Sequence, residues 1–66
     1  DVFPGEKYIL YVELAGDVFR TVKYVHKGKD DNHFKLVSEN RHHQDKEVRI
    51  DKVKAMAHVK FTIRLN

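Results

Sequence analysis

The sequence predicts a small all-β domain, either an antiparallel meander or a partly open barrel of about five strands. Three observations favour this class. Residues 7–14 and 17–26 are rich in β-branched and aromatic side chains, which are enriched in strands. Residues 55–65 alternate apolar and polar side chains, the period of a strand with one buried face. No segment shows a convincing 3.6-residue period, so α-helices are not expected.

The first three predicted strands are joined by short links. KYILYVEL (7–14) has apolar residues on both faces, as expected for a strand covered on both sides. Ala15-Gly16 predicts a tight reversal, because glycine accepts the positive φ of hairpin turns. After the second strand, GKDDN (28–32) has turn composition, and HFKLVS (33–38) predicts a third strand with Phe34 and Leu36 on one face. These strands should form an antiparallel meander.

The remaining residues predict a loop and two further strands. ENRHHQD (39–45) contains no apolar residue and indicates an exposed loop. KEVRI (46–50) predicts a short strand with Val48 and Ile50 inward, and IDKVKAM leaves room for one helical turn. The alternation of the closing strand predicts a buried face with Ala55, Ala57, Val59, Phe61, Ile63 and Leu65. The opposite face then carries Met56, His58, Lys60, Thr62 and Arg64.

Size and composition limit the classes of protein. The 66 residues allow one domain, residues 1–66, and a chain this short buries only about 60% of the surface that its unfolded form exposes. It contains no cysteine, which excludes disulfides and thiolate zinc sites and fits a cytoplasmic origin. No apolar run approaches the roughly 20 residues that span a bilayer, so no membrane association is expected. No small-molecule ligand or cofactor is indicated.

Lys23 is the candidate catalytic residue. Because strand side chains alternate, it shares one face of the second strand with Phe19, Thr21 and Val25. In one interpretation its methylene stem covers the core while the ammonium reaches water at the sheet edge. In the other, burial keeps the amine neutral, because desolvation disfavours the charged form, and Lys23 acts as a general base.

A neutral lysine is useful only beside a group to deprotonate, such as the serine of a Ser-Lys dyad. The only serine is Ser38, at the end of the third predicted strand, where serine usually caps a turn. Thr21 is two residues from Lys23, about 7 Å away by strand rise, which is too far for a ready hydrogen bond. The residues alone therefore provide half of a possible dyad.

A metal site and a nucleic-acid interface are the alternatives to a lysine base. The spacing of the five histidines does not favour a metal site, and loop solvation explains them better; they are His26, His33, His42, His43 and His58. The net charge of +3 permits an acidic partner, and small basic β-barrels bind single-stranded nucleic acid through aromatic side chains. Arg20 and Tyr24, on the face opposite Lys23, are the candidate contacts for that alternative.

The order of these elements resembles the C-terminal half of the LexA-like and phage-repressor peptidase domain, whose members cleave themselves with a Ser-Lys dyad. The matching elements are PGE before KYILYVEL, a Gly-Asp turn, DVFRTVKYV, a hairpin, and LVSEN followed by a loop, a short strand and a closing strand. TVKY and KLVSEN at their mutual spacing are the most specific parts. The resemblance covers nearly the whole chain.

The resemblance implies a role for Lys23 as the general base. It places the nucleophilic serine upstream of residues 7–14, in a Ser-Met-type motif that these residues lack, and gives Ser38 a structural position only. Tyr24 departs from the family, where a basic residue often follows the lysine. The implied protein is the C-terminal dimerisation and self-cleavage part of a bacterial or phage-type transcriptional regulator, inactive as a peptidase in this form.

The resemblance also implies partners. Family members pair through this half of the domain, partly by their closing strands, so we expect a homodimer with residues 55–65 at the contact. The predicted contact residues are Met56, His58, Lys60, Thr62 and Arg64. DNA is expected to bind only through an N-terminal helix-turn-helix that lies outside these residues.

Overall fold

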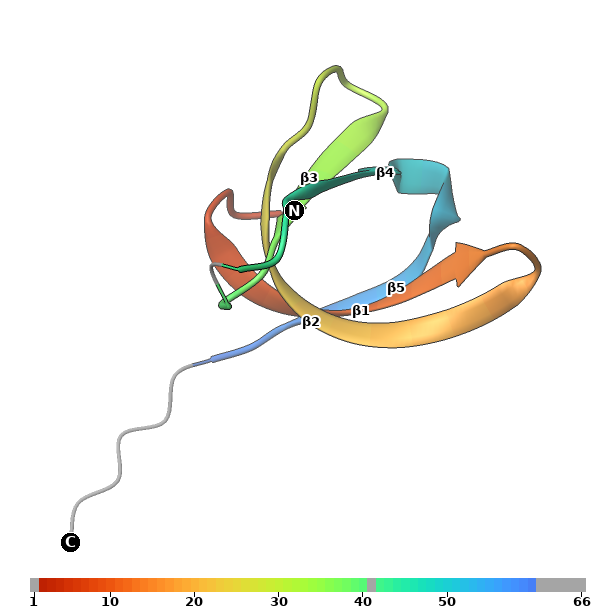
Figure 1. Ribbon diagram of the computed structural model, residues 1–66, viewed down its shortest axis with the longest axis horizontal. Helices are drawn as coiled ribbons and strands as arrows, with labels where there is room; N and C mark the ends of the chain where they lie inside the picture. Colours follow the sequence, from red (N-terminus) through yellow and green to blue (C-terminus); the bar gives the residue numbers. More distant parts are fainter. Residues whose placement is uncertain (1, 41, 61–66) are drawn as a thin grey trace, which may run out of the picture.

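The computed structural model describes residues 2–40 and 42–60 and contains one five-stranded antiparallel sheet in the order β4-β3-β2-β1-β5 (Figure 1). The all-β prediction is confirmed. The elements are β1 (Glu6–Leu14), β2 (Asp17–Lys27), β3 (His33–Val37), β4 (Lys46–Arg49), the single 3₁₀ turn η1 (Ile50–Lys52) and β5 (Val53–His58).

The first four strands form a meander joined by local turns. Leu14 pairs with Asp17 across a two-residue loop, in which Ala15 and Gly16 both have positive φ, 51° and 85°. This is the type I′ geometry, whose twist matches that of the flanking strands. β2 continues antiparallel to β3, and β3 to β4. The expected antiparallel arrangement of the first three strands is therefore confirmed.

The sheet is curled, because its two edge strands are consecutive in the chain. β4 and β5 lie at opposite edges, yet only η1 separates Arg49 from Val53. Four residues span at most about 14 Å, so the sheet must bend to bring these ends together. A register shift in the β1–β5 pairing between Tyr11 and Val12 adds a local bend. The result is the partly open barrel drawn in Figure 1, with η1 bridging the edges.

The core lies on the inner face of this curled sheet. Its buried side chains come from three neighbouring strands: Tyr8, Leu10 and Val12 of β1, Val25 of β2 and Leu36 of β3. Partly buried side chains complete it, namely Val2, Phe34, Val48, Val53 and Met56. Phe34 and Leu36 therefore share the inner face, and Val48 points inward, as the sequence predicts.

Two predictions about the C-terminal strands were wrong. Leu10 pairs with Met56, so Met56 packs on the core, while Ala55 and Ala57 are exposed. Alternation shows that a strand has two faces but not which one is buried, and methionine removes far more apolar surface from water than alanine. Phe61, Ile63 and Leu65, which favoured the other assignment, lie outside the described residues. Ile50 is 38% exposed and begins η1 instead of ending β4.

Candidate functional site

Lys23 lies on the inner face of β2, the middle strand of the sheet. Its cross-strand neighbour on β1 is the buried Tyr8. On the other side β2 pairs with β3, Tyr24 with Val37 and Val25 with Leu36. The same register extended by one residue places Ser38 beside Lys23, where the Lys23 Nζ donates a 2.6 Å hydrogen bond to the Ser38 Oγ. The structure thus brings together two residues that are 15 positions apart.

A hollow of about 180 Å³ opens beside this pair; we call it the Lys23 hollow. Its walls are mainly apolar and come from β1 to β4, with Leu14 and Phe19 about half exposed. The polar groups that line it with Lys23 and Ser38 are Thr21, Gln44, Lys46 and Glu47. Lys23 therefore does not lie at a sheet edge, as the snorkelling interpretation assumed, but beside a recess in the middle of the sheet.

The Lys23–Ser38 contact is the feature that sequence reasoning missed. The sequence predicts Ser38 at a turn and places Thr21 too far from Lys23, but the second strand pairs with the third as well as with the first. Two features of the sequence could have predicted this contact: the GKDDN turn and the alternation of both strands. A hairpin register that pairs Val25 with Leu36 also places position 23 opposite position 38. That register depends on the exact turn, which the sequence left open.

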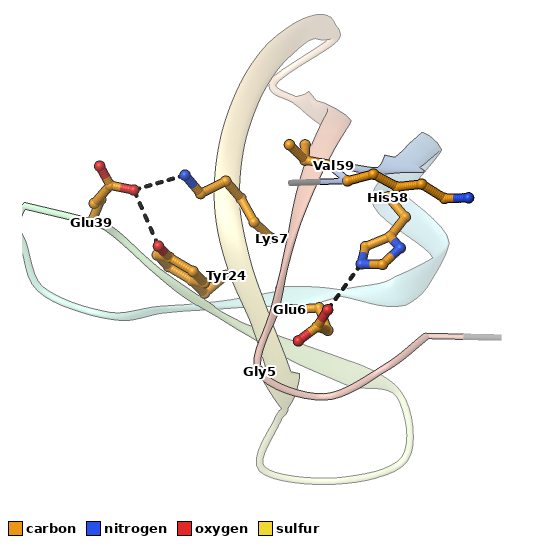
Figure 2. A pocket seen from close by; sticks show the side chains of 8 residues that line it. Gly5, Glu6, Lys7, Tyr24, Glu39, His58 and Val59 are labelled. Carbon is orange, nitrogen blue, oxygen red and sulfur yellow. Dashed lines mark hydrogen bonds and ion pairs between the residues drawn. The ribbon is translucent and has the colours of Figure 1, made fainter. Parts of the chain in front are cut away.

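A second, more polar hollow lies near the N-terminal end of β1 (Figure 2). Lys7 Nζ lies 2.8 Å from Glu39 Oε1, and the Tyr24 hydroxyl donates a 3.1 Å hydrogen bond to the same oxygen. The hydrogen bond from Lys7, followed by that from Tyr24, lowers the pKa of the Glu39 carboxyl. Glu39 in turn raises the pKa of Lys7. On the other side of this hollow, His58 Nε2 lies 3.1 Å from Glu6 Oε1.

Comparison with protein families decides what kind of domain this is. A family model described as Peptidase S24-like matches residues 1–60, nearly the whole chain. The chain belongs to the Peptidase S24-like family. The resemblance to LexA-like and phage-repressor domains is therefore confirmed at the level of the family. Searches of curated proteins and of solved structures found no match.

The structure of this S24-like domain also shows where the nucleic-acid candidates lie. Tyr24 is half-buried, with Lys7 Nζ 5.4 Å from the centre of its ring. Arg20 is exposed on the same face, about 13 Å away by strand rise. A nucleobase stacked over that side of Tyr24 would have to displace Lys7, and the Glu39 carboxylate would repel its phosphate. Nucleic-acid binding through Arg20 and Tyr24 stays a prediction.

The predicted contact residues of the dimer are only partly described. Met56 packs on the core, whereas the His58 ring lies against the buried Tyr8, with ring centroids 5.0 Å apart. Lys60 is exposed after the end of β5. Thr62 and Arg64 lie outside the described residues. Pairing of this S24-like domain through its closing strand stays a prediction.

The histidines of the S24-like domain do not converge. His33 Nδ1 lies 2.7 Å from Asp30 Oδ1, a contact that lowers the pKa of the aspartate. Within residues 2–40 and 42–60, no group of three or more His, Cys, Asp or Glu side chains could hold a metal ion. The same part of the chain has no helix long and apolar enough to cross a membrane.

Proposed function

We propose that this S24-like chain forms the lysine-bearing part of a Ser-Lys peptidase site, in which Lys23 is the general base. The observation that supports this most directly is the position of its amine, 2.6 Å from a hydroxyl oxygen and beside a hollow with apolar walls. A base must lie within hydrogen-bond reach of the proton that it removes. The geometry shows that the Lys23 amine reaches a hydroxyl in this hollow.

The proposed reaction is hydrolysis of a peptide bond in two steps. The unprotonated Lys23 amine takes the proton of a serine hydroxyl while the serine oxygen attacks the scissile carbonyl carbon. The C–N bond then breaks, Lys23 returns the proton to the leaving amine, and water hydrolyses the acyl-serine ester. By the family resemblance this serine comes from a segment outside residues 1–66, so residues 1–66 alone should have no peptidase activity.

The biological setting that we propose is self-cleavage of a bacterial or phage-type transcriptional regulator. The cut would separate a DNA-binding head from the part that dimerises. The position of β5 supports a role in dimerisation, because it ends the strand order next to β1. The outer edge of such a strand is a template for pairing with a second chain.

The test uses the full-length protein and follows its self-cleavage against pH by gel and mass spectrometry. The rate should rise with pH, because the base acts unprotonated. Lys23→Met keeps the length of the stem and removes the amine, and it should lower the rate at least about 10³-fold. Lys27→Met, an exposed position on the same strand, is the matched control and should cleave normally. A wild-type protein that stays intact at every pH would refute the proposal.

A further inference from the structure

We infer that Ser38 is the positioning residue for Lys23: its hydroxyl holds the amine at the Lys23 hollow and remains a partner in both protonation states of the lysine. This inference rests on the proposed function of Lys23 as a base. It concerns a residue that the family resemblance leaves without a chemical role.

The backbone around Ser38 is fixed from both sides. Before it, β3 is held to β2 by the pairs of Leu36 with Val25 and of Val37 with Tyr24. After it, the Glu39 carboxylate binds Lys7 of β1 and the Tyr24 hydroxyl of β2, as Figure 2 shows. Glu39 faces the opposite side of the sheet from Lys23. Its contacts therefore hold the chain in place without occupying the Lys23 hollow. The position of the Ser38 oxygen is therefore set by β1, β2 and β3 together.

Lysine needs such a partner because its stem is flexible. Fixing a lysine side chain in one rotamer costs conformational entropy, and a reacting group misplaced by about 1 Å can lose about 100-fold in rate. Without Ser38, the amine can turn toward the other polar groups that line the hollow, such as Gln44. The 2.6 Å contact with Ser38 holds it in one place.

A hydroxyl is a better hydrogen-bond partner for a lysine that acts as a base than a carboxylate would be. A serine hydroxyl accepts a hydrogen bond from an ammonium and donates one to a neutral amine. A carboxylate only accepts and favours the charged amine. Ser38 therefore holds Lys23 in place without keeping it protonated, and a nucleophilic serine needs only to approach the amine from the open side of the hollow.

The test compares self-cleavage of the full-length protein across pH for wild type, Ser38→Ala and Ser38→Thr, with Lys23→Met as the inactive reference. Ser38→Ala should cleave about 10- to 30-fold more slowly at every pH, including the high-pH plateau, because position and not protonation is lost. Ser38→Thr keeps the hydroxyl and should stay within about threefold of wild type. Circular dichroism checks that each variant folds. If Ser38→Ala does not fold, Ser38→Gly replaces it as the variant without a hydroxyl.

A second readout separates this inference from the proposed function. NMR relaxation of the Lys23 Cε should show a more mobile side chain in Ser38→Ala and recovery in Ser38→Thr, whether or not the protein cleaves itself. Cleavage at the wild-type rate with an ordered Lys23 in Ser38→Ala would overturn the positioning role. Loss of cleavage as complete as in Lys23→Met would overturn it too, because Ser38 would then be the nucleophile. Failure of the wild type to cleave refutes only the proposed function.

Discussion

Lys23 faces the interior because of where its strand lies and not because of its own chemistry. A lysine prefers water, but alternation along β2 puts positions 19, 21, 23 and 25 on one face. That face is the inner one, because its neighbours across the sheet include the buried Tyr8 and Leu36. The hollow and the Ser38 hydroxyl then accommodate the amine. A single polar residue in an apolar pattern on a central strand is thus placed inside the sheet by its strand and not by its own preference for water.

The charge of the Glu39 carboxylate should affect the stability of the folded protein. Its pKa is lowered in the folded protein by hydrogen bonds from Lys7 and Tyr24, so its contribution is present above the ordinary glutamate pKa, about 4.3, and is lost as pH falls through the lower folded value. The Lys7 pKa is raised, so its contribution is fully present below about 10.4 and is lost as pH rises through the higher folded value. The pair therefore stabilises between these limits.

Glu39→Gln should therefore lower the melting temperature at pH 7, and the difference from wild type should shrink toward zero near pH 2, where both proteins are uncharged at this position. Thermal unfolding followed by circular dichroism at several pH values measures this. The effect should be small, because the Glu39 carboxylate is exposed and solvent screens its pairing with the half-buried Lys7. Asp31→Asn, an exposed carboxylate in the β2–β3 turn, is the control. A wild-type advantage that is the same in acid would contradict the role of the ionised pair.

At the scale of elements, the β1–β2 hairpin has a suboptimal turn. Ala15 occupies the left-handed region with φ 51°, which costs a residue other than glycine about 1 kcal/mol or more. Asparagine tolerates this conformation, and Asn-Gly is a preferred type I′ pair. Ala15→Asn should therefore raise the free energy of unfolding by about 0.5 to 1 kcal/mol.

Urea unfolding of Ala15→Asn and wild type measures this difference. Ala57→Asn is the matched control, because Ala57 is exposed in the extended β5, where asparagine is disfavoured. It should not stabilise the protein. An Ala15→Asn variant no more stable than wild type would show that the turn is not strained in solution.

β5 shows that an alternating pattern predicts a strand but not which of its faces is buried. The sequence predicts a strand in this region, and β5 covers Val53–His58. The pattern did not show which face is inward, because the choice depends on register with β1, where Met56 meets the buried Leu10. Pairing between strands more than 40 residues apart is set by the whole sheet, not by the local sequence.

At the scale of the whole molecule, a short connection closes the fold. η1 joins the two edges of the sheet, and Ile50 N donates a 2.8 Å hydrogen bond to Asn32 O in the β2–β3 turn. A single curled sheet of this size leaves large apolar side chains on the surface, among them Tyr11, Val18 and Val22. Such a small core gains from association with a further surface.

The dimer prediction belongs to this scale. Residues 1–66 should sediment as a dimer at micromolar concentration. Lys60→Glu should weaken the dimer at least about tenfold, because in a two-fold contact each substitution enters the interface twice. Lys60 is a better test than Met56, whose substitution would disturb the core. Lys52→Glu on η1, also exposed, makes the same charge change away from β5. A monomeric mass at tens of micromolar would contradict the dimer.

The sequence by itself determined the local features of this protein. Periodicity and turn residues predict the strands of the meander, the Ala15-Gly16 turn and the face of Lys23. The resemblance of short motifs such as TVKY and KLVSEN to a known domain predicts the family. These depend on neighbours along the chain. Only the tertiary structure decided that Ser38 meets Lys23, that Met56 and not Ala57 faces the core, and that the sheet curls. These three features depend on strand register and on contacts between distant residues, and a shift of one residue in pairing would reverse every face.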